Sequence, residues 1–403
     1  MAGEYKDKSP ISKYDEIIES PDDSSGPLTF GVELEFLVAY LNVGVDDPDP
    51  NEERDLIRAG TYEEGSRKVL KIVQNGAFHI SFRSGENDIY IDPHFDIPRY
   101  NAWRLVHDGS LNFTRSKDYT WMSKELTSEI MGYDNPDFYV SRITDVCRAV
   151  RQTRVHLNRT TGVHVHVGRG EESFSLITMK KFATFIWFAD DLLLGLQHPY
   201  RRECHYCRPL HSASGLGKRA ASNLLRKGNP LSEAQEEEMN SFIPTTLLLM
   251  QTLQANKSIG EMADLMSDPT EPGSVNSYAV ARAFRGSVGF CNFMPMGKTG
   301  GNTHTFEFRQ MAGSLEPDAI IHWARVCMAV VDFARLSDAP RFKDLIGKIV
   351  KGEAEFSAFD LLLELGLVEE EKYFRSTVAG YKSGKLGFFP GAEEGRLFLP
   401  KLE

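Results

Sequence analysis

The sequence has few cysteines, no excess of basic charge and no long apolar run, and each shortage excludes a class of protein. Five cysteines among 403 residues, an odd number, do not form the disulfide framework of a small secreted domain. Asp and Glu number 57 against 46 Lys and Arg, so a chain with net charge −11 is not expected to bind nucleic acid. The most apolar run, residues 182–196, is too short to span a membrane and contains two aspartates. Because the N-terminus also lacks an apolar signal segment, we expect a soluble, cytoplasmic protein.

Short motifs that would identify a common enzyme class are also missing. The sequence has no G-x-S-x-G elbow of a serine hydrolase. Gly297-Lys298-Thr299 ends like a phosphate-binding loop, but Asn292 stands where the first glycine of that loop is required. Cys204 and Cys207 have no second pair at zinc-finger spacing. Residues 168–173 resemble a dinucleotide fingerprint, yet the preceding strand carries two histidines where a buried Rossmann strand is apolar.

The composition is that of a globular protein, with 41% hydrophobic and 26% charged residues. Residues 1–27 are rich in Lys, Asp, Ser and Pro and predict a flexible N-terminal arm. Residues 28–340 predict one large domain, with an acidic insertion at about 42–60 that we interpret as a solvated surface loop. Residues 341–403 predict a C-terminal helical extension packed on that domain.

Hydrophobic periodicity gives a coarse map of strands and helices. Strands are predicted at 28–40, 79–82, 89–91, 103–107, 121–126, 162–167 and 304–309. Helices are predicted at 63–75, 138–150, 176–196, 245–254, 258–266, 318–336, 354–365 and 369–378. Because strands and helices do not alternate regularly, the pattern favours an α+β fold with a mainly antiparallel sheet over a doubly wound α/β fold.

Three of these strands combine one apolar face with one face of charged or imidazole side chains, because residues two apart in a strand share a face. The polar faces hold Glu33 and Glu35, His164 and His166, and Thr305, Glu307 and Arg309. Such groups are costly to bury unless they are paired or bound. Carboxylates with imidazole suit divalent cations, and arginine suits phosphate or carboxylate. The joint pattern predicts a site for metal-dependent nucleotide or phosphoryl chemistry.

The same segments, in this order, resemble the fungal and bacterial amidoligase family. That family belongs to the carboxylate–amine ligases with the glutamine synthetase and glutamate–cysteine ligase fold. The similarity covers about residues 28–335. The segments that carry it are Gly31–Phe36 (GVELEF), Trp103 with Asp108–Leu111 (DGSL), Glu125–Ser128 (ELTS), Thr161–Gly168 (TGVHVHVG), Thr305–Gln310 (TFEFRQ) with Gly313–Leu315, and Ile320–Trp323.

The resemblance implies a curved antiparallel sheet that forms an active-site funnel and is covered by helices. It implies ATP, with two or three Mg²⁺ or Mn²⁺ ions as cofactors. His166 would contact the nucleotide phosphates, Arg309 would face the transferred phosphoryl group, and Arg201 or Arg202 would contact phosphate or substrate. The expected catalytic residues are Arg309, Glu307 and Glu33. The implied metal ligands are Glu33, Glu35, Glu125, His164 and Glu307.

The expected reaction joins a carboxylate to an amine through an acyl phosphate, so the protein needs no covalent nucleophile. An amino acid, a glutamyl group or peptide, or a metabolite acid would each serve as the carboxylate, and a homo-oligomer stays open. Two alternatives belong to other classes. A zinc-dependent hydrolase would use His164 and His166 with an acidic ligand. A non-catalytic family member would bind nucleotide alone.

Overall fold

The computed structural model describes most of the chain in separate stretches. The described residues are 23, 25–77, 79–84, 100–112, 117–217, 258–267, 286–293, 303–351, 355–387 and 396–402. The predicted strand at 89–91, the predicted helix at 245–254 and nearly all of the N-terminal arm lie outside them.

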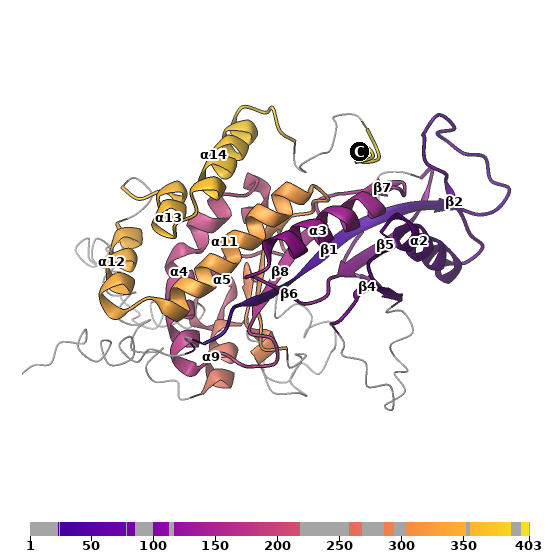
Figure 1. The fold of residues 1–403 in the computed structure, drawn as a ribbon. Helices are drawn as coiled ribbons and strands as arrows, with labels where there is room; N and C mark the ends of the chain where they lie inside the picture. Colours follow the sequence, from indigo (N-terminus) through magenta and orange to yellow (C-terminus); the bar gives the residue numbers. More distant parts are fainter. Residues whose placement is uncertain are drawn as a thin grey trace, which may run out of the picture.

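One open, mainly antiparallel sheet organises the described part of the chain (Figure 1). Its main path runs β3-β4-β5-β1-β8-β10-β9, with three short strands pairing with β1 beside this path. Among the described strands, only the β1–β2 and β3–β4 pairs are parallel. The strands are β1 (Thr29–Leu41), β2 (Ile57–Arg58), β3 (Phe82–Ser84), β4 (Trp103–His107), β5 (Thr120–Thr127), β6 (Met131–Gly132), β7 (Val155–His156), β8 (Gly162–Gly168), β9 (Val288–Gly289) and β10 (Phe306–Ala312).

Helices supply the remaining regular structure. They are α2 (Tyr62–Gly76), α3 (Pro136–Val150), α4 (Leu176–Gly195), α5 (Leu210–Ala213), α9 (Ile259–Met266), α11 (Pro317–Leu336), α12 (Ala339–Val350), α13 (Ala358–Glu364) and α14 (Val368–Lys382). Two 3₁₀ turns are also present among the described residues: η2 (Pro199–Glu203) follows α4, and η3 (Cys291–Phe293) follows β9. None of the described helices is long and apolar enough to cross a bilayer.

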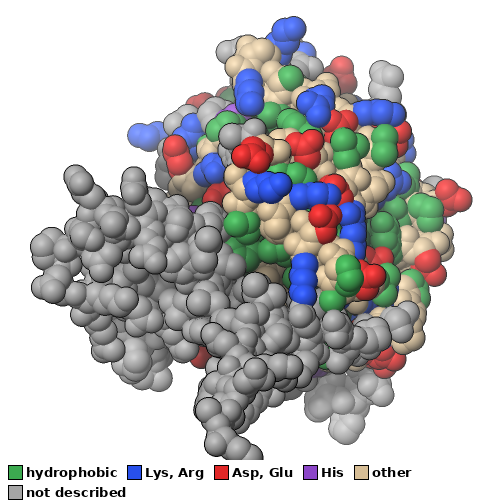
Figure 2. Space-filling view, turned by 90° about the vertical axis from the view of Figure 1, so that its left-hand side faces the viewer, with side chains coloured by type: hydrophobic (Ala, Val, Ile, Leu, Met, Phe, Trp, Pro, Cys, Tyr) green, Lys and Arg blue, Asp and Glu red, His purple; other side chains and the backbone are tan. Residues whose placement is uncertain are grey.

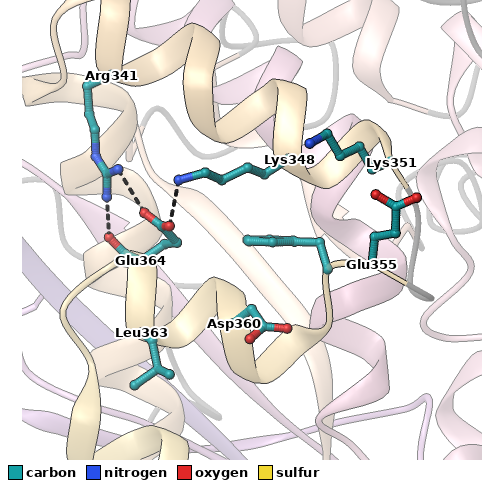
Figure 3. A pocket seen from close by; sticks show the side chains of 8 residues that line it. Arg341, Lys348, Lys351, Glu355, Asp360, Leu363 and Glu364 are labelled. Atoms are coloured by element: carbon teal, nitrogen blue, oxygen red, sulfur yellow. Dashed lines mark hydrogen bonds and ion pairs between the residues drawn. The ribbon is translucent and has the colours of Figure 1, made fainter.

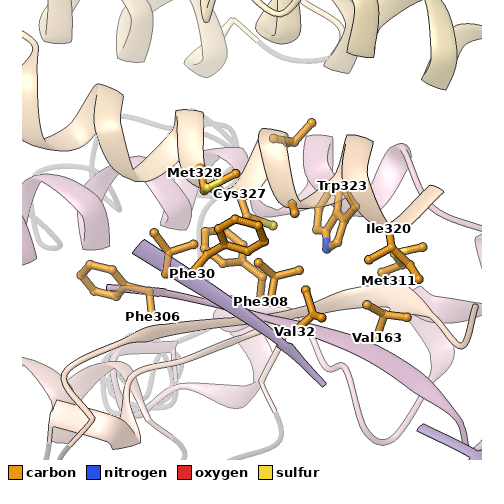
Figure 4. Close-up of a cluster of buried hydrophobic side chains, with 14 of the residues drawn as sticks. Phe30, Val32, Val163, Phe306, Phe308, Met311, Ile320, Trp323, Cys327 and Met328 are labelled. Atoms are coloured by element: carbon orange, nitrogen blue, oxygen red, sulfur yellow. The ribbon is translucent and has the colours of Figure 1, made fainter. Parts of the chain in front are cut away.

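The apolar face of the sheet packs on α3 and α11, which lie side by side across it (Figure 1). Helix α11 begins at Pro317, where the missing amide hydrogen of proline costs nothing. Figure 4 shows its Trp323 above the strand side chains, among them Val32, Val163 and Phe308. All four residues are at most 1% exposed. This packing fixes the direction of the sheet, because the alternate residues of the same strands must then face away from the core.

The C-terminal helices α12 to α14 pack beside α4 and α11. His322 on α11 stacks on Tyr373 of α14 at a centroid distance of 4.2 Å, and its Nδ1 lies 3.1 Å from Oε1 of Glu370. Helix α12 had no counterpart in the sequence prediction, although Asp338 caps it by accepting from the amide of Arg341.

Residues 42–56 of the acidic insertion form a loop, and this loop is tied to the domain. Asp47 accepts two hydrogen bonds of 2.8 Å from the guanidinium of Arg154, which is 3% exposed. Arg54, also buried, bonds Glu52 and donates to the carbonyls of Thr153 and Leu399. The interpretation of this loop as merely solvated was therefore incomplete, because two of its carboxylates neutralise buried arginines.

The outer surface mixes both signs of charge. On the face shown in Figure 2, Lys and Arg side chains alternate with Asp and Glu over the described part.

An open pocket of about 570 Å³ lies between α12 and α13 (Figure 3). Its Glu364 accepts from Lys348 and pairs with Arg341, both at 2.7 Å, so these charges already neutralise one another.

Candidate active site

The polar face of the sheet gathers the groups that the sequence placed on three separate strands. In the β1–β8 pair, Glu33 lies directly opposite His164. In the β1–β5 pair, Glu35 lies opposite Glu125. Directly opposite residues on one face are close neighbours, so the register brings these side chains together. Glu307 joins them because it lies opposite His166 in the β8–β10 pair.

Two acidic clusters result, each able to offer three ligand atoms to a cation. The first comprises Glu33, His166 and Glu307, whose ligand atoms all lie within 4.8 Å of one another. Nε2 of His166 is 3.1 Å from Oε1 of Glu33 and 3.9 Å from Oε1 of Glu307. The second comprises Glu35, Asp108 and Glu125, again within 4.8 Å.

Asp108 is the site residue that the sequence analysis did not single out. It follows β4 in the Asp108-Gly109-Ser110 turn, where it accepts from the amide of Ser110 at 2.7 Å. Strand β4 pairs with β5 so that Val106 lies opposite Glu125, and the turn therefore returns beside that carboxylate. The segment Asp108–Leu111, which follows the predicted strand at 103–107, was the available signal. The pairing of that strand with the strand that carries Glu125 could not be known from the sequence.

His164 lies between the two clusters. Its Nδ1 donates to Oε2 of Glu33 at 3.0 Å, because an ionised carboxylate can only accept. Its Nε2 lies 3.6 Å from Oε1 of Glu35. The side chain is 4% exposed, so it is held within the sheet face rather than at its opening. Among the described residues, neither three-ligand cluster contains both imidazoles, the arrangement that a zinc hydrolase would require.

The clustered charges shift the pKa of several of these groups. Burial works against ionisation of Glu33, but the charges of His166 and His164 and the hydrogen bond from His164 outweigh it and hold its pKa well below the usual range. Burial raises the pKa of Glu35 to about 7. Burial, together with the charges of Glu33 and Glu35, raises the pKa of Glu125 well above its usual value. The second cluster is therefore short of positive charge.

The residues present fit a divalent cation in each cluster. Nε2 of His166 is buried and has no hydrogen-bond partner among the described residues, although carboxylate oxygens surround it. Three carboxylates converge in the second cluster. The charge of Arg309 lowers the pKa of Glu35 and of Glu125, but it does not offset the burial that raises both. Carboxylate oxygen with one imidazole is the donor set of Mg²⁺ and Mn²⁺ sites.

One arginine of the polar face reaches the first cluster directly. Nη2 of Arg309 lies 2.6 Å from Oε1 of Glu307, and its side chain is 21% exposed. Burial lowers the pKa of Arg309, but the charges of Glu307 and Glu33 more than compensate and raise it. Its Nε has no hydrogen-bond partner within the described part of the chain. Arg309 therefore keeps donor capacity for a ligand at the edge of the metal cluster.

The two arginines of η2 lie in different places. Arg201 is 1% exposed, and its guanidinium contacts backbone carbonyls of β10. Arg202 is exposed and pairs with Asp191 at 3.1 Å.

Asn292 and Thr305 lie beside His166, each within hydrogen-bond distance of its Nδ1.

Comparison with known proteins agrees with this geometry. A family model described as "Putative amidoligase enzyme" matches residues 26–331, which is most of the chain. The chain belongs to the amidoligase family. The match includes every residue of both acidic clusters and Arg309. No curated protein matches the sequence. Membership of the amidoligase family makes the chain, in coarse terms, a member of a group of amide-forming ligases that act on carboxylates and amines.

Proposed function

We propose that this amidoligase is an ATP-dependent carboxylate–amine ligase that works through an acyl phosphate. The observation that carries the proposal is the placement of two carboxylate-rich clusters and one arginine on a single face of the sheet. Two cation sites beside an arginine match what transfer of the γ-phosphate of ATP requires, since that reaction depends on positioning and charge stabilisation. A hydrolase that used water alone would need neither the nucleotide nor Arg309.

Each cluster would hold one Mg²⁺ or Mn²⁺ ion. Glu33, His166 and Glu307 would bind one, and Glu35, Asp108 and Glu125 the other. Such ions supply charge neutralisation for the phosphates of a bound nucleotide.

The side chains of the polar face then position the substrates. Arg309 would orient and neutralise the γ-phosphoryl group, while Glu307 holds the guanidinium in place. An oxygen of the substrate carboxylate attacks the γ-phosphorus, and the bond to the ADP oxygen breaks. The nitrogen of the amine then attacks the acyl carbon, phosphate leaves, and the amine loses a proton to give the amide. The carboxylate is that of an amino acid, a glutamyl group or a metabolite acid.

The experiment is a screen for ADP release with a panel of carboxylates, each with and without amines, followed by mass spectrometry of the product. We expect metal-dependent ADP release that requires both substrates. The Glu307→Gln variant should lose more than about 100-fold of this activity while it stays folded, because it loses a cation ligand and the anchor of Arg309. Glu369→Gln is the matched control, since Glu369 is exposed and pairs with Lys372 on the surface of α14.

Three results would contradict the proposal. Full activity in a folded Glu307→Gln protein would show that the site is misplaced. Lost stability with undiminished turnover would reduce Glu307 to a structural partner of Arg309. Tightly bound zinc together with no ATP binding by calorimetry would favour the hydrolase alternative instead.

A further inference from the structure

Strand β10 contains a β-bulge directly beside the two clusters. Phe308 lies opposite Val165 of β8, whereas Met311 lies opposite Val163, and the register shifts between them. Two residues of β10 therefore face the single residue His164. An extra residue of this kind bends the strand and changes the direction of the side chains that follow.

The bulge decides which face each side chain of β10 takes. In a regular strand, Glu307, Arg309 and Met311 would all share the polar face. With the extra residue, Met311 joins Phe308 on the apolar side under α11 (Figure 4). Arg309 stays beside Glu307, whereas the side chain of Gln310 reaches Asp190. Arg309 is itself one of the two residues of the bulge, so its direction depends on the geometry of the bulge.

Arg201 supplies hydrogen-bond donors to this bulge. Its Nε donates to the carbonyl of Gln310 at 3.2 Å, and its Nη2 donates to the carbonyl of Arg309. Bulged residues break the regular ladder, and buried carbonyls need partners. A guanidinium satisfies two neighbouring carbonyls at once, because its donors lie in a rigid planar fork.

The other side of the bulge is held as well. The Gln310 side chain donates to Oδ1 of Asp190 at 3.3 Å, and Ser287 donates to Oδ2 of the same carboxylate at 2.7 Å. The amide of Arg309 donates to the carbonyl of Ser287 at 2.8 Å. The bulge is thus clamped between the guanidinium of Arg201 and the carboxylate of Asp190.

We propose that Arg201 is a positioning residue, which fixes the bulge of β10 and so aims Arg309 at the phosphoryl group. This role differs from the direct contact with phosphate or substrate that the family resemblance implies for Arg201 or Arg202. Two of its nitrogens are already bonded to carbonyls, and the side chain is 1% exposed. The effect on catalysis rests on the proposed ligase function, whereas the effect on β10 does not.

Hydrogen exchange tests the structural half without any activity. In the Arg201→Gln protein, amides in residues 306–312 should exchange at least about 10-fold faster than in the wild type, because the bulge opens more often. Arg54→Gln is the matched control. Arg54 is also buried and donates to the carbonyls of Thr153 and Leu399, beyond the far end of β1. It should leave exchange in 306–312 unchanged. Unchanged exchange there in Arg201→Gln would overturn the proposal.

Kinetics separate positioning from phosphate binding. Arg201→Lys keeps the charge but replaces the planar fork with a single ammonium nitrogen, and it should fold. We expect its kcat to fall about 100-fold, with the KM for ATP changed less than about threefold. When Arg309→Lys is already present, adding Arg201→Lys should lower kcat by less than about a further threefold, because its effect acts through Arg309. Additive losses, or a KM for ATP that rises as far as kcat falls, would overturn the positioning role.

The two failures are distinguishable. If the wild type releases no ADP with any substrate pair, the ligase function fails, and hydrogen exchange still decides whether Arg201 holds the bulge. If the wild type is active but the kcat losses of Arg201→Lys and Arg309→Lys are additive, the ligase function stands and the positioning role fails.

Discussion

Glu33 and His164 are direct partners across the β1–β8 pair, and Nδ1 of His164 lies 3.0 Å from Oε2 of Glu33. The same imidazole turns its Nε2 toward Glu35, 3.6 Å away. His164 therefore connects a residue of the first acidic cluster to a residue of the second. It holds both carboxylates in place, which leaves His166 as the imidazole that faces the first cluster.

The two clusters should bind cations separately. We expect the wild type to bind two Mn²⁺ ions and Asp108→Asn or His166→Asn each to bind one, with the affinity of the altered site reduced more than about 10-fold. Each change removes one ligand from one cluster only. Titration calorimetry and the electron paramagnetic resonance of free Mn²⁺ count the ions. Loss of both ions in either variant would show a single shared site, and two unchanged ions would exclude the residue as a ligand.

Gly162 should be required for the second cluster. Its amide donates to Oε2 of Glu35 at 2.6 Å, and an added Cβ would lie 3.1 Å from Nε2 of His164 and 3.3 Å from Oε2 of Glu35. Gly162→Ala should therefore push both side chains away and lower Mn²⁺ affinity about 10-fold, with the fold retained. Mn²⁺ titration and thermal unfolding measure the two effects.

Gly347→Ala is the control for that substitution. Nothing lies within 4 Å of a Cβ added at Gly347, which is exposed on α12. The change should leave Mn²⁺ affinity unaltered and stabilise the helix by about 0.5–1 kcal/mol. An unaltered Mn²⁺ affinity in Gly162→Ala as well would show that the close approach at Gly162 has no functional importance.

Periodicity was enough to predict the strands that carry the site. The alternation in β1 and β8 placed Glu33 and Glu35 on one face and His164 and His166 on one face, and the structure confirms both. The prediction succeeded because the side chains on the opposite face of these strands are buried. An antiparallel sheet with one packed face alternates apolar and polar residues, and the sequence shows that period of two. The mixed fold with a large antiparallel sheet is confirmed for the same reason.

Features that depend on pairing between strands were out of reach. Asp108 joins the second cluster only because β4 lies beside β5, and sequence alone does not give strand order. The bulge in β10 depends on Arg201, which is distant along the chain. The predicted strand at 304–309 also differs from its observed bounds, Phe306–Ala312, which include the bulge. Pairing and bulges are tertiary properties, set by partners that no local pattern records.

The acidic insertion should contribute to stability through one pair of residues. Asp47 accepts two hydrogen bonds from Arg154, so Asp47→Ala leaves a buried guanidinium without its main acceptor and should cost about 1–3 kcal/mol of unfolding free energy. Burial of Asp47 raises its pKa, but the hydrogen bond from Arg154 outweighs this and lowers it. The stabilisation is therefore present at neutral pH and is lost as the pH falls through the lowered pKa.

Urea unfolding checks this prediction. Asp49→Ala, at an exposed position two residues further on, is the control and should change the unfolding free energy by less than about 0.5 kcal/mol. Equal effects of the two substitutions would mean that the loop is only a solvated insertion, and that the bond to Arg154 has no net value.

Asp190 should make the protein less stable as the pH rises through weakly acidic values. Burial raises its pKa to about 6, against hydrogen bonds from the amide of Leu210, Ser287 and Gln310. Between about pH 4 and pH 6, the unfolded chain has lost this proton while the folded protein still holds it. The folded state then binds more protons, so the unfolding free energy falls with rising pH and levels off above about 6.

Asp190→Asn removes that dependence and should fold. The amide is nearly the same size, and Gln310 can turn its side chain to accept from it, because Oε1 of Gln310 has no partner among the described residues. The unfolding free energy of the variant, relative to the wild type, should therefore increase by about 2–3 kcal/mol between pH 4 and pH 6.5. Urea unfolding at a series of pH values measures this difference. A difference that stays constant over the range would show that Asp190 is already ionised in the folded protein at pH 4, and that its three hydrogen bonds outweigh its burial.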